Sequence, residues 1–273
     1  GVGVGRPGWH IECSAMALRL LEGAPIDIHA GGVDLIFPHH ENEIAQSEGS
    51  TGETFSRFWV HVEHLLLDKD VKMSKSLGNV VTVQEILQEG YRASALRYVL
   101  ISTHYRKQLR FTWESLAQAE EALRRLMDCL GRLERVSGDA GDGGITSRVD
   151  GALAAFNARL ADDLNTPGAL GVMFELVRDV NAAIDANGLS ADDAQRVRDT
   201  FDRFDDVLGV IALRRVEDAA PPVDIEEIER LIGNRKEARR NRDFAAADAI
   251  RDDLESRGVI LEDSPSGTRG KRK

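Results

Sequence analysis

The chain has 273 residues, of which 42% are hydrophobic and 30% charged, and its formal net charge is −11. This length suits one large domain or two to three ordinary ones, and the apolar share is normal for a globular protein. The sequence has no run of about 18 apolar residues and no signal-peptide pattern, which argues against membrane insertion and secretion and makes the cytoplasm the expected location.

In chain order, the first predicted element is a helix from Trp9 to Glu22, which has a periodic apolar face. Strands are expected at residues 26–29, 58–62 and 65–67. Between the first two strands, residues 30–32 should form a loop, and a helix should start at Pro38. Strands that alternate with helices predict a parallel sheet of the doubly wound type, in which ligands bind beyond the carboxyl ends of the strands.

From about Thr82 onward the apolar spacing is helical, and no further strand is expected. Long helices are predicted from about Val149 to Ala186 and from Ser190 to Leu208. Residues 218–222 are the best linker in the chain, and a small helical unit should follow them. The predicted fold is therefore α/β in the first part and all-α in the remainder.

The cysteines and the charged residues indicate the compartment in which the chain works and whether it could bind nucleic acid. Two cysteines, Cys13 and Cys129, cannot form a disulfide framework, so we expect thiols in a reducing compartment. The acidic charge argues against nucleic acid binding, since phosphate neutralisation supplies most non-specific affinity. Local basic clusters nevertheless occur at residues 235–242 and 269–273. On charge alone, a solvated helix face and a disordered tail are the favoured explanations.

Cys13, His39 and Glu43 are the strongest candidates for a metal site. His39 and Glu43 lie four residues apart in a predicted helix and would share one face. Zinc takes sulfur, nitrogen and oxygen ligands in tetrahedral geometry, and its catalytic sites leave one position for water or substrate. A lone cysteine or a lone pair of this kind is more often structural, so the interpretation depends on the surrounding motifs.

A second motif spans residues 72–76, with Leu77, Gly78 and Asn79 after it. Its two lysines, Lys72 and Lys75, flank small hydroxyl residues and could bring positive charge to a polyphosphate. Lysine suits the role of a point charge. Short Lys/Ser loops are mostly surface turns, so the order of the residues carries the argument.

That order matches the signature loop of class I aminoacyl-tRNA synthetases, and residues 5–16 and 34–43 closely resemble cysteinyl-tRNA synthetases. The resemblance continues at residues 162–167 and 243–251, so it covers nearly the whole chain. It implies ATP-dependent activation of cysteine to cysteinyl-adenylate, with Mg accompanying ATP, and transfer of the cysteinyl group to tRNA(Cys) in translation. A monomer with one zinc ion per chain is expected.

The resemblance also implies roles for single residues. In this family, zinc is held by two cysteines, a histidine and a glutamate and takes the substrate thiolate; the later three ligands match Cys13, His39 and Glu43. Metal ligation of this kind could reject serine without an editing site. The other matches are Trp9, which would close over the amino acid, the active-site histidine His29, the ATP loop with Gly31, Gly32 and Asp34, and the catalytic lysines Lys72 and Lys75, of which Lys75 is the principal ATP contact.

The implied domains follow the predicted elements. Residues 1–84 would be the C-terminal part of a Rossmann-like catalytic domain with the zinc site and the signature loop. Residues 85–218 would be a helical bundle that contacts the tRNA stem. Residues 219–273 would be a small helical anticodon-recognition domain with a basic tail.

The chain departs from the family in three places. The family's first zinc cysteine and its His-x-Gly-His element, which grips the ATP phosphates, precede the region where this chain begins, so we expect the chain alone to be inactive. Residues 91–97 lack the usual acidic residue before Ala-Leu-Arg, and residues 267–271 lack the usual Trp.

Two other functions stay open on the sequence. One is the related ATP-dependent ligase of mycothiol synthesis, which joins cysteine to glucosaminyl-inositol and shares the zinc and signature-loop patterns. The long helical tail argues against it, because a small acceptor needs no anticodon-reading unit. The other is a tRNA-binding or zinc-binding module without catalysis.

Overall fold

The computed structural model describes residues 3–5, 8–67, 71–72, 80–138, 144–219, 225–241, 243–257, 259–264 and 267–272. The chain forms two compact units. The first comprises Gly1–Val80, Val99–Ser115 and Ala155–Gly171. The second comprises Val81–Tyr98, Leu116–Ala154 and Val172–Lys273. No helix in the described part of the chain combines the length and apolar composition needed to cross a membrane.

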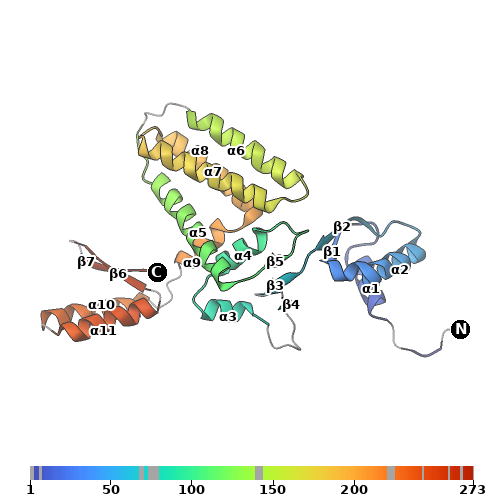
Figure 1. Ribbon diagram of the computed structural model, residues 1–273, viewed down its shortest axis with the longest axis horizontal. Helices are drawn as coiled ribbons and strands as arrows, with labels where there is room; N and C mark the ends of the chain where they lie inside the picture. Colours follow the sequence, from blue (N-terminus) through green and yellow to red (C-terminus); the bar gives the residue numbers. More distant parts are fainter. Residues whose placement is uncertain are drawn as a thin grey trace. The chain divides into compact units, whose positions relative to one another are not determined.

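The first unit begins with helix α1 (Trp9–Leu20), strand β1 (Ile26–Gly32), helix α2 (Glu41–Thr51) and strand β2 (Ser56–Val62). Strands β1 and β2 pair in parallel, and α1 packs against α2 beside them (Figure 1). A hydrogen bond links α1 to α2, because Oγ of Ser14 donates to Oε1 of Gln46 at 3.0 Å. This packing brings the middle of α1 to the start of α2.

One local prediction in this region was wrong. The predicted loop at residues 30–32 belongs to β1, since the backbone continues to pair with β2 up to Gly32 opposite Val62. Two short helical turns, η1 (Val33–Leu35) and η2 (Ile36–His40), precede α2, and Phe37 is the only residue of η2 with non-helical backbone angles. The backbone is therefore helical from Pro38 into α2, as predicted, and His39 lies one turn before Glu43.

A second, small sheet follows. Strand β3 (Leu65–Leu67) pairs antiparallel with β4 (Val71–Lys72) and in parallel with β5 (Leu109–Arg110). The expectation that no strand follows Thr82 was therefore wrong. Strand β5 has only two residues, which is too short to show an alternation of apolar and polar side chains in the sequence. Only its pairing with β3 identifies it as a strand.

The helical remainder is built from amphipathic helices. They are α3 (Val83–Gln88), α4 (Ala93–Ile101), α5 (Trp113–Leu133), α6 (Gly144–Ala161), α7 (Thr166–Asp185), α8 (Ala191–Leu208) and α9 (Ile211–Ala219). The apolar face predicted for α5 is buried and includes Leu116, Leu123 and Leu126. The single helix predicted from Val149 to Ala186 is two helices, because residues 162–165 form a tight corner.

The C-terminal part contains helix α10 (Ile225–Arg240), helix α11 (Phe244–Ser256) and an antiparallel hairpin of β6 (Val259–Ser264) and β7 (Gly267–Arg272). Ile232, Leu254 and Val259 form its small core. The sequence analysis predicted the helices but not the hairpin. Of the predicted basic cluster at residues 235–242, Arg235 is buried and Lys236, Arg239 and Arg240 are exposed.

Candidate metal and active site

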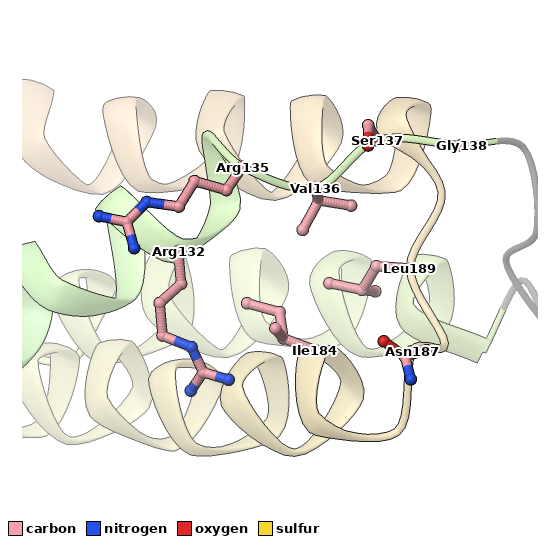
Figure 2. A pocket seen from close by; sticks show the side chains of 8 residues that line it. All are labelled: Arg132, Arg135, Val136, Ser137, Gly138, Ile184, Asn187 and Leu189. Atoms are coloured by element: carbon pink, nitrogen blue, oxygen red, sulfur yellow. The ribbon is translucent and has the colours of Figure 1, made fainter. Parts of the chain in front are cut away.

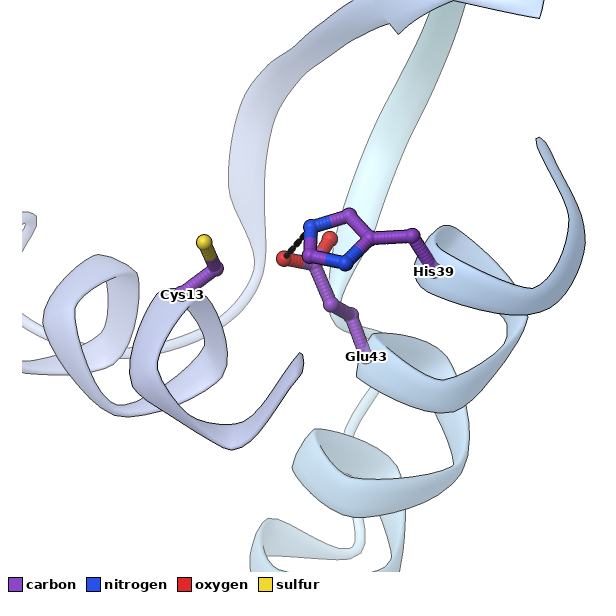
Figure 3. A group of neighbouring side chains, drawn as sticks. All are labelled: Cys13, His39 and Glu43. Atoms are coloured by element: carbon purple, nitrogen blue, oxygen red, sulfur yellow. Dashed lines mark ion pairs between the residues drawn. The ribbon is translucent and has the colours of Figure 1, made fainter. Parts of the chain in front are cut away.

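The predicted metal ligands lie together. Cys13 comes from α1, His39 from the turn η2 and Glu43 from the first turn of α2, and their ligand atoms all lie within 4.8 Å of one another (Figure 3). His39 and Glu43 are buried and Cys13 is partly buried. The three side chains offer sulfur, nitrogen and oxygen donors around one point, which is a donor set that zinc accepts.

The Glu43 carboxylate is the clearest sign that a cation belongs here. It is 0% exposed, and neither oxygen has a hydrogen-bond partner in the described part of the chain. Imidazole nitrogens nevertheless face both oxygens, with Nε2 of His39 at 3.2 Å and Nε2 of His29 at 2.8 Å. A buried carboxylate without a hydrogen-bond donor is costly, and a cation bound to its oxygens would offset that cost.

The orientation of His39 depends on His10, which the sequence analysis did not single out. The two Nδ1 atoms are 2.7 Å apart, so one ring donates to the other. This contact occupies Nδ1 of His39 and leaves its Nε2 directed toward Glu43. A metal-bound histidine commonly holds its second nitrogen in this way. His10 could have been found from its position, since it lies one helical turn before Cys13.

The pKa of the Cys13 thiol is also affected by the Glu43 carboxylate. Burial is the main cause that raises the pKa of Cys13 above its ordinary value, and the nearby Glu43 carboxylate raises it further. The thiolate is therefore disfavoured when no positive charge is present. A divalent cation reverses this balance, because a coordinating thiol is deprotonated outright.

A second group of possible ligands shares Glu43 and consists of His29, His40 and Glu43. Nδ1 of His40 lies 2.8 Å from Nε2 of His61 on β2. Burial lowers the pKa of His40 to about 4, and the neighbouring histidines His29, His61 and His39 contribute. This group lacks sulfur, so the Cys13 group is the better match for a soft metal.

Aromatic rings from β2 pack against these histidines. The Trp59 ring centroid is 4.8 Å from that of His29 and 5.0 Å from that of His40. Sequence reasoning missed Trp59 and His61 as members of the site. The available signal was their spacing of two residues in a strand, which directs both side chains to the same face.

The remaining predicted amino acid and ATP residues lie around this centre. Trp9 is 73% exposed, and its ring stands edge-on to the His39 ring with centroids 6.4 Å apart. A Cβ added to Gly31 would lie 2.7 Å from Cε1 of His40, so the absence of a side chain there admits the His40 ring. Asp34 is exposed, and its Oδ1 is 4.0 Å from Nδ1 of His64.

The signature loop is only partly described. Lys72 lies in β4, with its backbone opposite Leu66 of β3. Lys75 lies outside the described residues. The structure therefore places the strand that enters the loop, while the expected ATP contact of Lys75 stays a prediction.

A separate cavity of about 510 Å³ lies in the helical unit, at the ends of α5 and α7 (Figure 2). Its lining residues are Arg132, Arg135, Val136, Ser137, Gly138, Ile184, Asn187 and Leu189. Arg132 is already paired, since it donates to Asn181 at 2.6 Å and forms an ion pair with Asp185. None of the predicted site residues that the structure describes lines this cavity.

Three family models match the chain. Residues 1–121 match the class I tRNA synthetase (C) catalytic domain, residues 155–212 the DALR domain, and residues 225–269 the anticodon-binding domain of cysteinyl-tRNA ligase. The agnB2 LeuRS of Agrobacterium radiobacter K84, solved in a ternary complex with tRNA and LeuAMS, aligns with a TM-score of 0.53 at 19% identity, over 70% of this chain and 28% of that one. At this identity the likeness concerns the fold alone.

Curated relatives extend the comparison. The cysteine–tRNA ligase of Protochlamydia amoebophila is 43% identical over 270 residues, which is 99% of this chain and 55% of the relative. That of Solibacter usitatus is 46% identical over 273 residues, which is 100% of this chain and 58% of the relative. The chain thus spans somewhat more than half the length of the curated relatives it matches. It belongs to the cysteine–tRNA ligase family of class I synthetases.

Proposed function

We propose that this chain supplies the zinc centre, the signature loop and the tRNA-binding helical part of a cysteine–tRNA ligase. The enzyme would activate cysteine with ATP to cysteinyl-adenylate and transfer the cysteinyl group to tRNA(Cys). The observation that carries the proposal is the convergence of Cys13 and His39 on the buried Glu43 carboxylate, whose oxygens have no hydrogen-bond partner in the described part of the chain. The match of residues 225–269 to an anticodon-binding domain supports tRNA over a small acceptor such as glucosaminyl-inositol.

Cys13, His39 and Glu43 would hold one zinc ion, with a fourth position free for another ligand. Zinc, when bound, supplies a thiophilic site that favours the cysteine thiolate over the serine hydroxyl. His10 would fix the His39 ring, and His29 would steady the Glu43 carboxylate from the opposite side. The exposed Trp9 ring at the edge of the centre would cover the bound amino acid.

The ATP side of the reaction would use Gly31, Gly32 and Asp34 for the nucleoside, and Lys72 and Lys75 for the phosphates. Lysine ammonium groups stabilise the charge that develops on the leaving pyrophosphate. Mg would accompany ATP. The two ammonium groups would act most strongly as the α-phosphate bond breaks, which makes them catalytic rather than simple binding residues.

The helical regions would bind tRNA. We assign residues 1–84 to the catalytic domain, residues 85–218 to the bundle that contacts the tRNA stem, and residues 219–273 to anticodon recognition. The exposed Lys236, Arg239 and Arg240 of α10 provide positive charge for RNA phosphates in an otherwise acidic protein. A monomer acting in the cytoplasm is the form in which we expect the enzyme to work.

Metal analysis tests the ligand assignment. Replacing Cys13 by Ala should remove most of the zinc that copurifies with the folded chain, because the sulfur ligand is lost. Cys129→Ala is the matched control, since Cys129 is the other free cysteine and is buried in α5. Equal zinc content in the two variants would contradict the assignment.

A further inference from the structure

The corner between α6 and α7 has an unusual backbone. Asp163 and Leu164 both adopt a φ of 55°, in the left-handed region that residues other than glycine seldom occupy. Leu164 is 52% exposed, so burial of its side chain does not explain the conformation. Backbone strain of this kind persists where surrounding contacts impose it and often has a functional reason. The contacts of Asp163 supply that reason.

Asp163 holds the segment that follows α4. Tyr105 Oη donates to its Oδ1 at 2.5 Å, and Arg106 donates through Nε to Oδ2 at 2.5 Å and through Nη2 to Oδ1 at 3.1 Å. Nε2 of His104 lies 3.9 Å from Oδ2. The hydrogen bonds from Arg106 and Tyr105 lower the pKa of Asp163 to about 2. We call Asp163, Tyr105 and Arg106 the Asp163 clamp.

A second contact fixes the same corner. Thr166 begins α7, and its Oγ1 donates to the carbonyl oxygen of Ile101, the last residue of α4, at 2.8 Å. The corner is thus attached at both ends of the short segment from Ile101 to Arg106. All of these residues belong to the first compact unit, together with the metal-site elements.

Backbone hydrogen bonds on both sides of β5 tie the clamped segment and the residue after β5 to the chain around β3. Glu63 N donates to the carbonyl oxygen of Tyr105 at 2.8 Å, and Phe111 N donates to that of Leu66 at 2.8 Å. Leu66 also stands opposite Lys72 in the β3–β4 pair. A series of contacts therefore runs from the Asp163 side chain, through Tyr105 and Arg106 and then through backbone hydrogen bonds, to the strand from which the signature loop starts.

We propose that Asp163 is a positioning residue that holds β5, and through it β3 and β4, so that the signature loop begins from a fixed strand. The inference rests on the proposed function, which makes Lys72 part of an ATP loop. Asp163 lies in the DALR match, whereas Tyr105 and Arg106 lie in the catalytic-domain match. The DALR domain thereby sets the geometry of a catalytic element.

Hydrogen exchange on the full chain tests the structural step. Asp163→Asn is the informative variant, because asparagine tolerates a left-handed backbone, while the change removes the negative charge and one of the two oxygens that accept from Tyr105 and Arg106. The backbone amides of Glu63 and Phe111 should exchange about two- to fivefold faster, the size expected when an exposed ion pair is weakened. The matched control is Asp162→Asn at the exposed neighbouring position, which should leave both amides unchanged. Unchanged exchange in Asp163→Asn overturns the inference.

Kinetics of the full-length enzyme test the functional step. In cysteine-dependent ATP–pyrophosphate exchange, Asp163→Asn should lower kcat by about two- to fivefold with an unchanged KM for cysteine. A raised KM for cysteine at unchanged kcat, or unaltered kinetics, overturns the coupling and leaves the proposed function intact. If the unsubstituted enzyme shows no ATP–pyrophosphate exchange, the proposed function is overturned, and so is the coupling of Asp163 to catalysis. Hydrogen exchange still reports the clamp itself in that case.

Discussion

At the scale of single residues, the site is defined by groups that lack ordinary partners. The buried Glu43 carboxylate faces the ring nitrogens of His29 and His39 without a hydrogen bond in the described structure. The raised pKa of Cys13 has the same origin, because burial and negative charge both disfavour the thiolate. One divalent cation bound by Cys13, His39 and Glu43 would stabilise both the Cys13 thiolate and the Glu43 carboxylate.

Removing the support of His39 should weaken metal binding without removing a ligand. In His10→Ala the ring of His39 loses the contact at Nδ1, and the affinity for zinc should fall about 10- to 100-fold, as is typical for residues that orient a metal ligand. Competition with a chromogenic chelator measures the change. His64→Ala, which alters a histidine beside Asp34, is the control. Equal affinity in both variants would remove His10 from the centre.

The Asp163 carboxylate should remain charged in moderately acidic solution. Its folded pKa of about 2 lies below the ordinary 3.8, so its ionised form stabilises the fold above pH 3.8, and this contribution is lost as the pH falls toward 2. Tyr105, Arg106 and His104 face it. A ¹³C titration of the carboxyl carbon should show a midpoint near 2. A midpoint near 3.8 would mean that the clamp is absent in solution.

At the scale of elements, β1 and the turns η1 and η2 fit together at Gly31. The His40 ring and Leu35 occupy the space that a side chain at this position would need. The turn η2, which sets the position of both His39 and His40, therefore depends on a glycine in the neighbouring strand. The sequence analysis expected Gly31 to serve ATP, and this packing role came only from the structure.

A methyl group at Gly31 should destabilise the fold. Gly31→Ala would place its Cβ 2.7 Å from the His40 ring, and we expect a loss of about 1–3 kcal/mol in the free energy of unfolding, as for other overpacked sites. Urea denaturation measures it. Gly49→Ala in α2 is the matched control, because no described atom lies within 4 Å of its added Cβ. It should be neutral or stabilising by up to about 1 kcal/mol. Equal effects would disprove the packing role.

Much of the fold could be predicted where local patterns were long. The apolar period of α5 and the start of α8 at Ser190, where a capping box with Asp193 forms, are encoded in neighbouring residues. Strand β5 and the corner at Asp163 could not be predicted, because their conformations depend on partners about 45 to 60 residues away. The three candidate metal ligands were proposed from motifs and lie together in the structure. The spacing of His10, Trp59 and His61 gave a weaker signal, and their contacts with the site became visible only in the packing of α1, η2 and β2.

At the scale of the whole molecule, the chain covers 55–58% of the two relatives described above. The candidate zinc centre takes three ligand side chains from the described residues. In the function proposed above, this chain would contribute that centre, the signature loop and tRNA-binding helices to a cysteine–tRNA ligase.

An activity assay on the 273-residue chain by itself tests whether it can activate cysteine. We expect no cysteine-dependent ATP–pyrophosphate exchange from the 273-residue chain and clear exchange from the full-length enzyme. The physical reason is that the chain lacks the His-x-Gly-His element expected to grip the ATP phosphates. Exchange by the chain alone would show that other residues take over this role.

Zinc K-edge X-ray absorption on the zinc-loaded chain tests the central claim most directly. The account predicts one sulfur ligand at about 2.3 Å, with nitrogen and oxygen ligands completing the shell, and loss of the sulfur signal in Cys13→Ala but not in Cys129→Ala. A zinc shell without sulfur in the unsubstituted chain, or a sulfur signal that survives Cys13→Ala, would contradict it.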